Sequence, residues 1–182
     1  MTRRVLNYRL RNFVTPRAAI AAAMVFPICT LAITTRSTPR NALLIWNASA
    51  SAPIGLYRTI HDGAVSRGDL VLAIPPASVG AFAAARGYLP LGVPLVKRVA
   101  GVSGDTICAV HENITINGRR IAVRLATDRK RRELPGWSGC HTLARGEIFL
   151  LMADVRDSFD GRYFGPVSTS QITARLEPIW TR

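Results

Sequence analysis

The chain has 182 residues, enough for one domain with a substantial core, and its hydrophobic content of 48% is typical of a globular protein. Its net charge of +13 first suggests nucleic acid or an anionic membrane surface as a partner. The arginines are spread along the chain, however, and no helix-turn-helix, RNA-binding signature or zinc-ligand spacing accompanies them. We therefore expect no specific nucleic-acid binding, no metal site and no cofactor.

An uncharged stretch of 18 residues, 18–35, precedes the rest of the chain. As a helix rising ~1.5 Å per residue it would be about 27 Å long, close to the thickness of a bilayer core. Five arginines lie before it and only Arg36 and Arg40 follow it closely, which places the N-terminus in the cytoplasm. The expected segments are a basic cytoplasmic segment (1–17), a transmembrane anchor (18–35), a linker (36–40) and a periplasmic domain (41–182).

Two other interpretations of residues 18–35 stay open. A cleaved secretory signal has the same charge pattern, although no convincing small-x-small cleavage site precedes the linker. A buried core helix is also compatible with this length, and the stretch contains Pro27. If the anchor is right, the following chain faces an oxidising compartment, where Cys108 and Cys140 could form a disulfide while Cys29 stays in the membrane.

After the linker, residues 41–46 are apolar and predict a first strand. The next segment, 47–58, combines small residues with proline and glycine, which disfavours a helix and predicts a loop with an accessible backbone. Ser49 and Ser51 lie two positions apart, so they share a face where the segment is extended. The ordinary alternative is a turn in which both serines bond the local backbone.

The rest of the chain alternates short apolar runs with Gly and Pro turns. Residues 78–86 are the only good helical candidate there, with Gly87 as a stop. Asn117-Gly118 is a strong hairpin signal, and the polar, basic residues 127–139 are expected to form a long exposed loop. Strands are expected at 70–74, 90–100, 105–116, 119–125, 146–152 and 172–179. This pattern predicts a mostly-β domain, either a barrel or two packed sheets.

The chain has only two lysines, Lys97 and Lys130, among its 24 basic residues. Lys130 lies in an Arg-Lys-Arg-Arg run, whereas Lys97 lies in an apolar strand that breaks into Gly-x-x-Gly-Asp. A desolvated lysine can lose its proton near neutral pH and act as a base, which arginine cannot do. The ordinary alternative is an edge-strand lysine with its ammonium group in water.

A serine on a loop of small residues and a lysine in an apolar strand together make the Ser–Lys form of nucleophile and general base. The three histidines, by contrast, are expected in turns or loops and belong to no recognisable nucleophilic set; they are His61, His111 and His141.

Three acidic residues fall within seven positions in the segment 153–166: Asp154, Asp157 and Asp160. A calcium loop is one interpretation, but the glycine and glutamate of an EF-hand are missing. The others are a solvated turn held by local ion pairs and a structural support that orients a neighbouring site.

Three segments, in this order, resemble the three boxes of the type I signal peptidases: Asn-x-Ser-x-Ser-x-Pro-x-Gly-Leu-Tyr (47–57), Lys-Arg-Val-x-Gly-x-x-Gly-Asp (97–105) and Ser-Phe-Asp-Gly-Arg-Tyr-Phe-Gly (158–165). Their spelling is most similar to that of the TraF-type conjugative transfer signal peptidases. The resemblance implies a signal-peptidase-like β catalytic domain behind one N-terminal transmembrane helix.

The resemblance also implies roles. Ser51 would be the nucleophile, Lys97 its general base, and the Ser49 hydroxyl would join the Ser51 N–H in an oxyanion hole. The supporting shell around the lysine would be Ser158, Asp160 and Arg162. Ser51 lies two residues before proline where general signal peptidases have three, so Ser49 stays a minor candidate nucleophile.

Asp154 and Asp157 match the family pattern poorly. Because Asp160 close to Lys97 would raise the lysine pKa, we expect Asp160 to pair mainly with Arg162. We expect Lys97 itself to be neutral and largely buried.

By resemblance, the chain is expected to be a serine endopeptidase of the bacterial inner membrane with a periplasmic catalytic domain. Its partners would be the bilayer and exported precursors with small residues before the cleavage site, in particular a pilin-like subunit of plasmid transfer that the enzyme could also cyclise. The alternatives are a general type I signal peptidase and a non-catalytic, basic, anchored scaffold of a transfer complex. A self-cleaving repressor of the LexA type also uses Ser and Lys, but the first 40 residues offer an anchor instead of a DNA-binding module.

Overall fold

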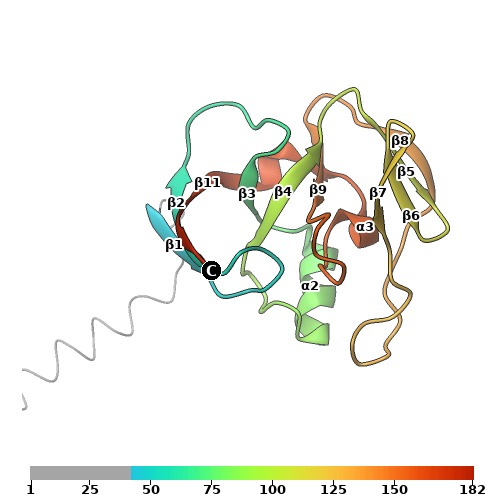
Figure 1. The fold of residues 1–182 in the computed structure, drawn as a ribbon, viewed down its shortest axis with the longest axis horizontal. Helices are drawn as coiled ribbons and strands as arrows, with labels where there is room; N and C mark the ends of the chain where they lie inside the picture. Colours follow the sequence, from blue (N-terminus) through green and yellow to red (C-terminus); the bar gives the residue numbers. More distant parts are fainter. Residues whose placement is uncertain (1–41) are drawn as a thin grey trace, which may run out of the picture. The chain divides into compact units, whose positions relative to one another are not determined.

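A computed structural model describes residues 42–182 and shows two antiparallel sheets (Figure 1). The larger sheet has the strand order β1-β2-β11-β3-β4-β9-β10 and the smaller one β7-β6-β5-β8. The strands of the larger sheet are β1 (Leu44–Asn47), β2 (Gly55–Ile60), β3 (Leu70–Ala73), β4 (Leu95–Gly101), β9 (Glu147–Leu151), β10 (Val167–Ser168) and β11 (Ile172–Thr181). Those of the smaller sheet are β5 (Thr106–Val110), β6 (Asn113–Ile116), β7 (Arg119–Val123) and β8 (Gly139–Thr142). The predicted mostly-β, two-sheet architecture is confirmed.

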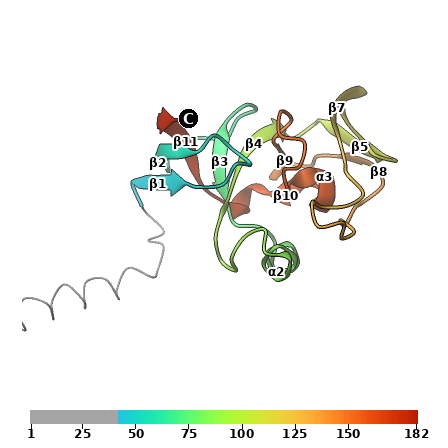
Figure 2. The ribbon, with the colours of Figure 1, turned by 60° about the horizontal axis from the view of Figure 1, so that its bottom comes forward.

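Helix α2 (Ala77–Arg86) connects β3 to β4 and lies below these two strands in both views (Figures 1 and 2). It ends where the sequence predicts, because Gly87 adopts φ 71°, a left-handed conformation that costs glycine little. The other short elements are helix α3 (Gly161–Phe164) and the 3₁₀ turn η2 (Thr169–Gln171). No helix within residues 42–182 is long and apolar enough to cross a bilayer. The expected cytoplasmic segment, anchor and linker lie outside the described residues.

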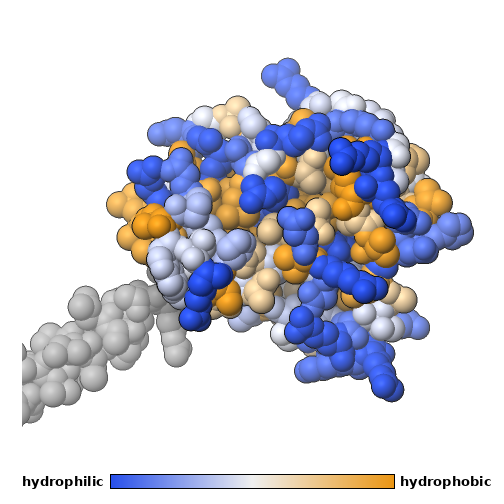
Figure 3. All heavy atoms as spheres, viewed as in Figure 1, coloured by the Kyte–Doolittle hydropathy of each residue, from blue (hydrophilic) through white to orange (hydrophobic). Residues whose placement is uncertain are grey.

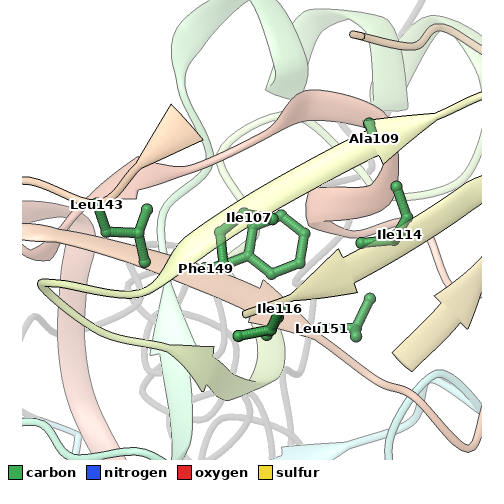
Figure 4. Packing of buried hydrophobic residues seen from close by; sticks show 7 residues of the cluster. All are labelled: Ile107, Ala109, Ile114, Ile116, Leu143, Phe149 and Leu151. Atoms are coloured by element: carbon green, nitrogen blue, oxygen red, sulfur yellow. The ribbon is translucent and has the colours of Figure 1, made fainter. Parts of the chain in front are cut away.

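Buried apolar side chains hold the two sheets together. One cluster fills the space between the smaller sheet and β9, with Ile107, Ile114 and Phe149 among its members (Figure 4). Successive side chains of a strand point to opposite faces, so neighbouring residues of β4 serve different clusters. Val96 packs with residues of β2 and β11, whereas Val99 packs with residues of β3, β9 and β10. The lysine between them is therefore embedded in the core of the larger sheet.

Several expected elements have different bounds in the structure. The single strand expected over 105–116 is a hairpin, β5 and β6, turned at His111 with φ 52°. His111-Glu112 lacks the Gly, Asn or Asp that signals such a turn, whereas Asn117-Gly118 forms the expected hairpin turn with both φ angles positive. The loop expected over 47–58 ends early, because β2 begins at Gly55. An added Cβ there would lie 2.0 Å from the Trp180 carbonyl oxygen, so only glycine fits.

The segment expected as an exposed loop, 127–139, is only partly solvated. Its basic tip is exposed and strongly hydrophilic (Figure 3), but Asp128 accepts hydrogen bonds from the Tyr88 hydroxyl and the Arg132 guanidinium. The Trp137 indole donates to the Gly161 carbonyl oxygen at 3.0 Å. These contacts tie the segment to α2 and α3. The sequence signal missed the contacts with Tyr88 and Gly161 because these residues lie 40 and 24 positions from their partners.

Cys108 and Cys140 are joined by a disulfide between facing residues of β5 and β8. Strand β8 consists of exposed residues, and its sequence, Gly-Cys-His-Thr, carries no strand signal of its own. The cross-link and the backbone pairing with β5 hold it in place. His141, expected in a loop, therefore lies in a strand, where its Nε2 contacts the Glu147 carboxylate at 2.7 Å.

Replacing both Cys108 and Cys140 by alanine is expected to lower the free energy of unfolding by about 3–4 kcal/mol, because the bond closes a loop with a sequence separation of 32 residues. Urea unfolding followed by tryptophan fluorescence measures the change. Reduction of the wild-type protein serves as the control and should give the same loss, while the double variant should be insensitive to reductant. A loss below about 1 kcal/mol would mean that the cross-link does not restrain the unfolded chain.

Candidate active site

Lys97 lies in the middle of β4, and its side chain is 1% exposed. Its ammonium nitrogen donates a hydrogen bond to Ser158 Oγ at 2.9 Å. Burial lowers the pKa of Lys97 from its ordinary value to about 8, because removal from water disfavours the charged form. Asp160 opposes that effect by stabilising the ammonium, and Arg162 adds to it by repulsion. The side chain is buried, as expected, and its pKa is shifted in the direction that favours the neutral lysine.

The segment that supports Lys97 is held by a buried ion pair. The Asp160 carboxylate accepts from Arg162 Nε at 2.8 Å and from the Met152 backbone N–H at 3.0 Å. The Arg162 guanidinium also donates to the carbonyl oxygens of Met152, Val155 and Arg156 at 2.8–3.1 Å. Asp160 and Arg162 are 0% and 1% exposed. Charges buried so deeply are tolerated because each is paired and hydrogen-bonded.

Gly161 lies between these two charged residues and has no room for a side chain. An added Cβ would be 2.7 Å from the Leu150 carbonyl oxygen and 2.8 Å from the Phe149 ring. The close approach lets α3 begin directly against β9, with the Asp160 carboxylate accepting from the Arg162 N–H at the helix start. The Asp-Gly-Arg sequence is therefore explained by two features: the ion pair between Asp160 and Arg162, and the close contact of Gly161 with β9.

Phe159 is a residue whose position the sequence gave no reason to single out. It lies between two buried residues of the site and points the other way, into a cluster of four rings: Phe82, Tyr88, Tyr163 and Phe164, with centroids 5.4–5.7 Å from its own. Two of these rings belong to α2 and the turn after it. The helix therefore covers the outer side of the segment whose inner side contacts Lys97. The only feature of the sequence that could have indicated this cluster is the number of aromatic residues within 159–164.

Ser49 and Ser51 lie in the turn after β1, and their hydroxyl oxygens are 2.9 Å apart. The Ser51 backbone N–H donates to Ser49 Oγ at 3.3 Å. The Ser51 N–H is thus bonded to the Ser49 hydroxyl within the turn, the local bonding that the ordinary interpretation of this segment predicts for Ser49. Ser51 is half-buried and Ser49 is exposed, so both can be approached from solvent.

The structure brings the predicted residues together in two groups. One is the buried set around Lys97, and the other is the serine pair. Within residues 42–182, no hydrogen bond joins Lys97 to Ser51. Val96 and Ala52, which adjoin Lys97 and Ser51 in the chain, pack in one core cluster, but Val96 and Lys97 point to opposite faces of β4. A cavity of about 710 Å³ lies elsewhere, beside the segment 124–138, and includes neither group.

The chain belongs to the S26 family of signal peptidases, since the family model for signal peptidase, peptidase S26, matches residues 17–181. It is similar to a plasmid transfer protein TraF of Escherichia coli, with 36% identity over 147 residues that cover 74% of this chain and 81% of that protein. It is 32% identical over 145 residues, with the same coverage, to a conjugal transfer protein TraF of Agrobacterium tumefaciens (strain 15955).

Among solved structures, a signal peptidase I from Enterococcus faecalis V583 aligns with 63% of this chain and 98% of its own, at 21% identity and a TM-score of 0.38. Family membership suggests a serine peptidase of the signal peptidase I type that acts on precursor proteins. Together with the Cys108–Cys140 disulfide, it suggests a domain outside the cytoplasm, where disulfides persist.

Proposed function

We propose that the chain is a membrane-anchored serine endopeptidase in which Ser51 is the nucleophile and Lys97 the general base. The observation that carries the proposal is Lys97 itself: a lysine buried in an apolar sheet with its pKa lowered to about 8. A structural lysine gains nothing from such burial, because desolvation of an ammonium group destabilises the fold. A base that must be neutral for part of the time benefits from it.

In the proposed reaction, Ser51 Oγ attacks the carbonyl carbon of the scissile bond while Lys97 Nζ takes the hydroxyl proton. The Ser51 N–H exchanges its bond to Ser49 Oγ for one to the substrate, so that this N–H and the Ser49 hydroxyl stabilise the negative charge that develops on the carbonyl oxygen. Lys97 then gives the proton to the leaving amine, and an ester between the substrate and Ser51 remains. Water, activated by the same lysine, hydrolyses this ester.

The Lys97 to Ser51 hydrogen bond is proposed to form when substrate binds. Hydrogen bonds between catalytic groups are often long before substrate arrives and tighten in the complex. The Lys97 ammonium already has one neutral partner, the Ser158 hydroxyl, which holds it without stabilising its charge as a carboxylate would. Asp160 stabilises that charge only through space, because its hydrogen bonds come from Arg162 and the Met152 N–H.

The proposed substrate is an exported precursor cut after small residues at the outer face of the inner membrane. The similarity to TraF proteins of plasmid and conjugal transfer favours a conjugative pilin precursor over the general secreted proteins of a housekeeping signal peptidase. The substrate's own amino terminus could resolve the ester in place of water and cyclise the product, and the mass of the product distinguishes the two outcomes.

The pH dependence of cleavage tests the proposed base in the wild-type enzyme. Because Lys97 must lose a proton, kcat/KM is expected to rise about tenfold per pH unit below pH 7 and to level off above a midpoint near 8. The measurement uses purified full-length protein and a precursor peptide between pH 5.5 and 10. A midpoint near 6.5 would indicate a histidine base instead. Absence of cleavage at every pH would favour the non-catalytic scaffold.

A further inference from the structure

Asn47, the last residue of β1, has a side chain that is bonded on every side although the family resemblance assigns it no role. It is 6% exposed. Its Oδ1 accepts from the Ser49 backbone N–H at 3.0 Å. Its Nδ2 donates to the carbonyl oxygens of Ser49, Ala52 and Pro53 at 3.0, 3.2 and 2.9 Å. Only one orientation of the amide fits, because a flipped amide would set its oxygen against three carbonyl oxygens.

These bonds span the turn that carries Ser51. The backbone closes this turn with only one long hydrogen bond, from the Ala52 N–H to the Ser49 carbonyl oxygen at 3.4 Å. The side chains of residues 48–50 are exposed, so packing contributes little to the shape of the turn's first half. Asn47 reaches both halves, since its partners lie before and after Ser51. The Tyr57 hydroxyl adds one further bond, to the Pro53 carbonyl oxygen at 2.6 Å.

We propose that Asn47 is a positioning residue for the serine turn. It fixes Ser51 Oγ, the Ser51 N–H and the Ser49 hydroxyl in one arrangement, so that nucleophile and oxyanion donors meet the same substrate carbonyl. The proposal rests on the proposed function of Ser51. Asn47 itself contacts none of the reacting atoms and acts only through the backbone of its neighbours.

The physical reason for such a residue is the composition of the turn. Small side chains in an Ala-Ser-Ala-Ser-Ala stretch allow many backbone conformations, and ordering each residue costs about 1–2 kcal/mol of conformational entropy. A buried amide that satisfies four backbone groups selects one of these conformations. A displacement of about 1 Å of a reacting group is enough to lower turnover roughly 10²-fold. Preorganisation of this turn is therefore expected to affect kcat much more than substrate affinity.

Asn47→Ala removes all four bonds, and Asn47→Asp keeps the acceptor for the Ser49 N–H but sets a carboxylate oxygen against three carbonyl oxygens. Steady-state cleavage of a precursor peptide by full-length protein in detergent is the measurement. Both variants are expected to lower kcat at least tenfold, and up to about 10²-fold, while KM stays within about twofold. In Asn47→Ala the midpoint of the pH profile should not move, because Asn47 makes no hydrogen bond to Lys97.

Asn117→Asp is the matched control. Asn117 also uses both ends of its amide, accepting from the Thr106 N–H at 2.8 Å and donating to the Asp105 carboxylate at 2.9 Å, but it lies in the hairpin turn between β6 and β7. Its variant should lower the unfolding midpoint and leave the kcat of the folded protein unchanged. A purely structural Asn47 would behave in the same way, and that result would overturn the proposal.

Ser51→Ala separates this proposal from the one it rests on. If Ser51→Ala is inactive and Asn47→Ala keeps kcat within about threefold of wild type, the role of Asn47 is wrong and the proposed nucleophile stands. If Ser51→Ala is active, the proposed function itself fails. Should Asn47→Ala not fold, Asn47→Asp takes its place, because it keeps the acceptor for the Ser49 N–H and loses the bonds to the three carbonyl oxygens. A kcat within about threefold of wild type in that variant would again overturn the proposal.

Discussion

Lys97→Arg is expected to reduce the rate of precursor cleavage by roughly 10³–10⁶-fold. Ser51→Ala is expected to reduce it by a similar factor. The substituted guanidinium stays protonated at every pH that a protein tolerates, so it can accept no proton from the serine hydroxyl. A positive charge is preserved in this variant, which means that a purely electrostatic role of Lys97 would survive the change. The loss therefore measures the proton transfer. The effects of Lys97→Arg and Ser51→Ala on the rate should also be strongly non-additive, because nucleophile and base act as one unit.

Lys130→Arg is the matched control for this prediction, since Lys130 is the chain's only other lysine and is exposed on the basic tip of the segment 127–139. It should cleave at the wild-type rate within about twofold. Ser49→Ala should have an activity between those of Lys130→Arg and Lys97→Arg. Its kcat should be lowered about 10²–10³-fold, the usual effect of one missing oxyanion donor. A Ser49→Ala variant less active than Ser51→Ala would exchange the roles of the two serines. Turnover above about a tenth of wild type in Lys97→Arg would rule out lysine as the base.

Arg162→Met is expected to lower the free energy of unfolding by about 3–5 kcal/mol, because it leaves the Asp160 carboxylate charged, fully buried and without its partner. It also removes the donor to three carbonyl oxygens of the segment 152–156. Asp160→Asn should cost a similar amount for the reciprocal reason. Urea unfolding of the full-length protein in detergent measures both. The control is Arg58→Met, whose ion pair with Glu177 is 62% and 50% exposed and should contribute less than about 1 kcal/mol.

The same pair of variants has a second readout in the pH profile of cleavage. Asp160 raises the pKa of Lys97 and Arg162 lowers it. Removing the carboxylate should therefore move the midpoint of kcat/KM to lower pH, and removing the guanidinium should move it to higher pH. Shifts in the same direction would contradict this account of the site's electrostatics. A loss of stability without either shift would make the pair a structural support that does not tune the base.

The sequence predicted those elements of the fold that depend on local signals. Helix α2 with its stop at Gly87 and the Asn117-Gly118 hairpin turn follow from conformations that few residues adopt easily. The hairpin at His111 was missed because His111-Glu112 lacks the residues that signal such a turn, and strand β8 and helix α3 were missed because their contacts come from residues far away in the sequence. Strand β8 is the clearest case: it is exposed, and pairs with β5 across a separation of 32 residues.

For the candidate site, the sequence by itself determined which residue types were available. Lys97 is the one lysine in an apolar strand, the serines lie on a loop of small residues, and Asp160 and Arg162 lie two positions apart. The predicted pairing of Asp160 with Arg162 is confirmed. Only the structure showed that Ser158 bonds Lys97 and that Asn47 bonds the serine turn. The reason is physical, since burial and hydrogen-bond geometry, which set a pKa or select a loop conformation, arise when strands distant in sequence pack against each other.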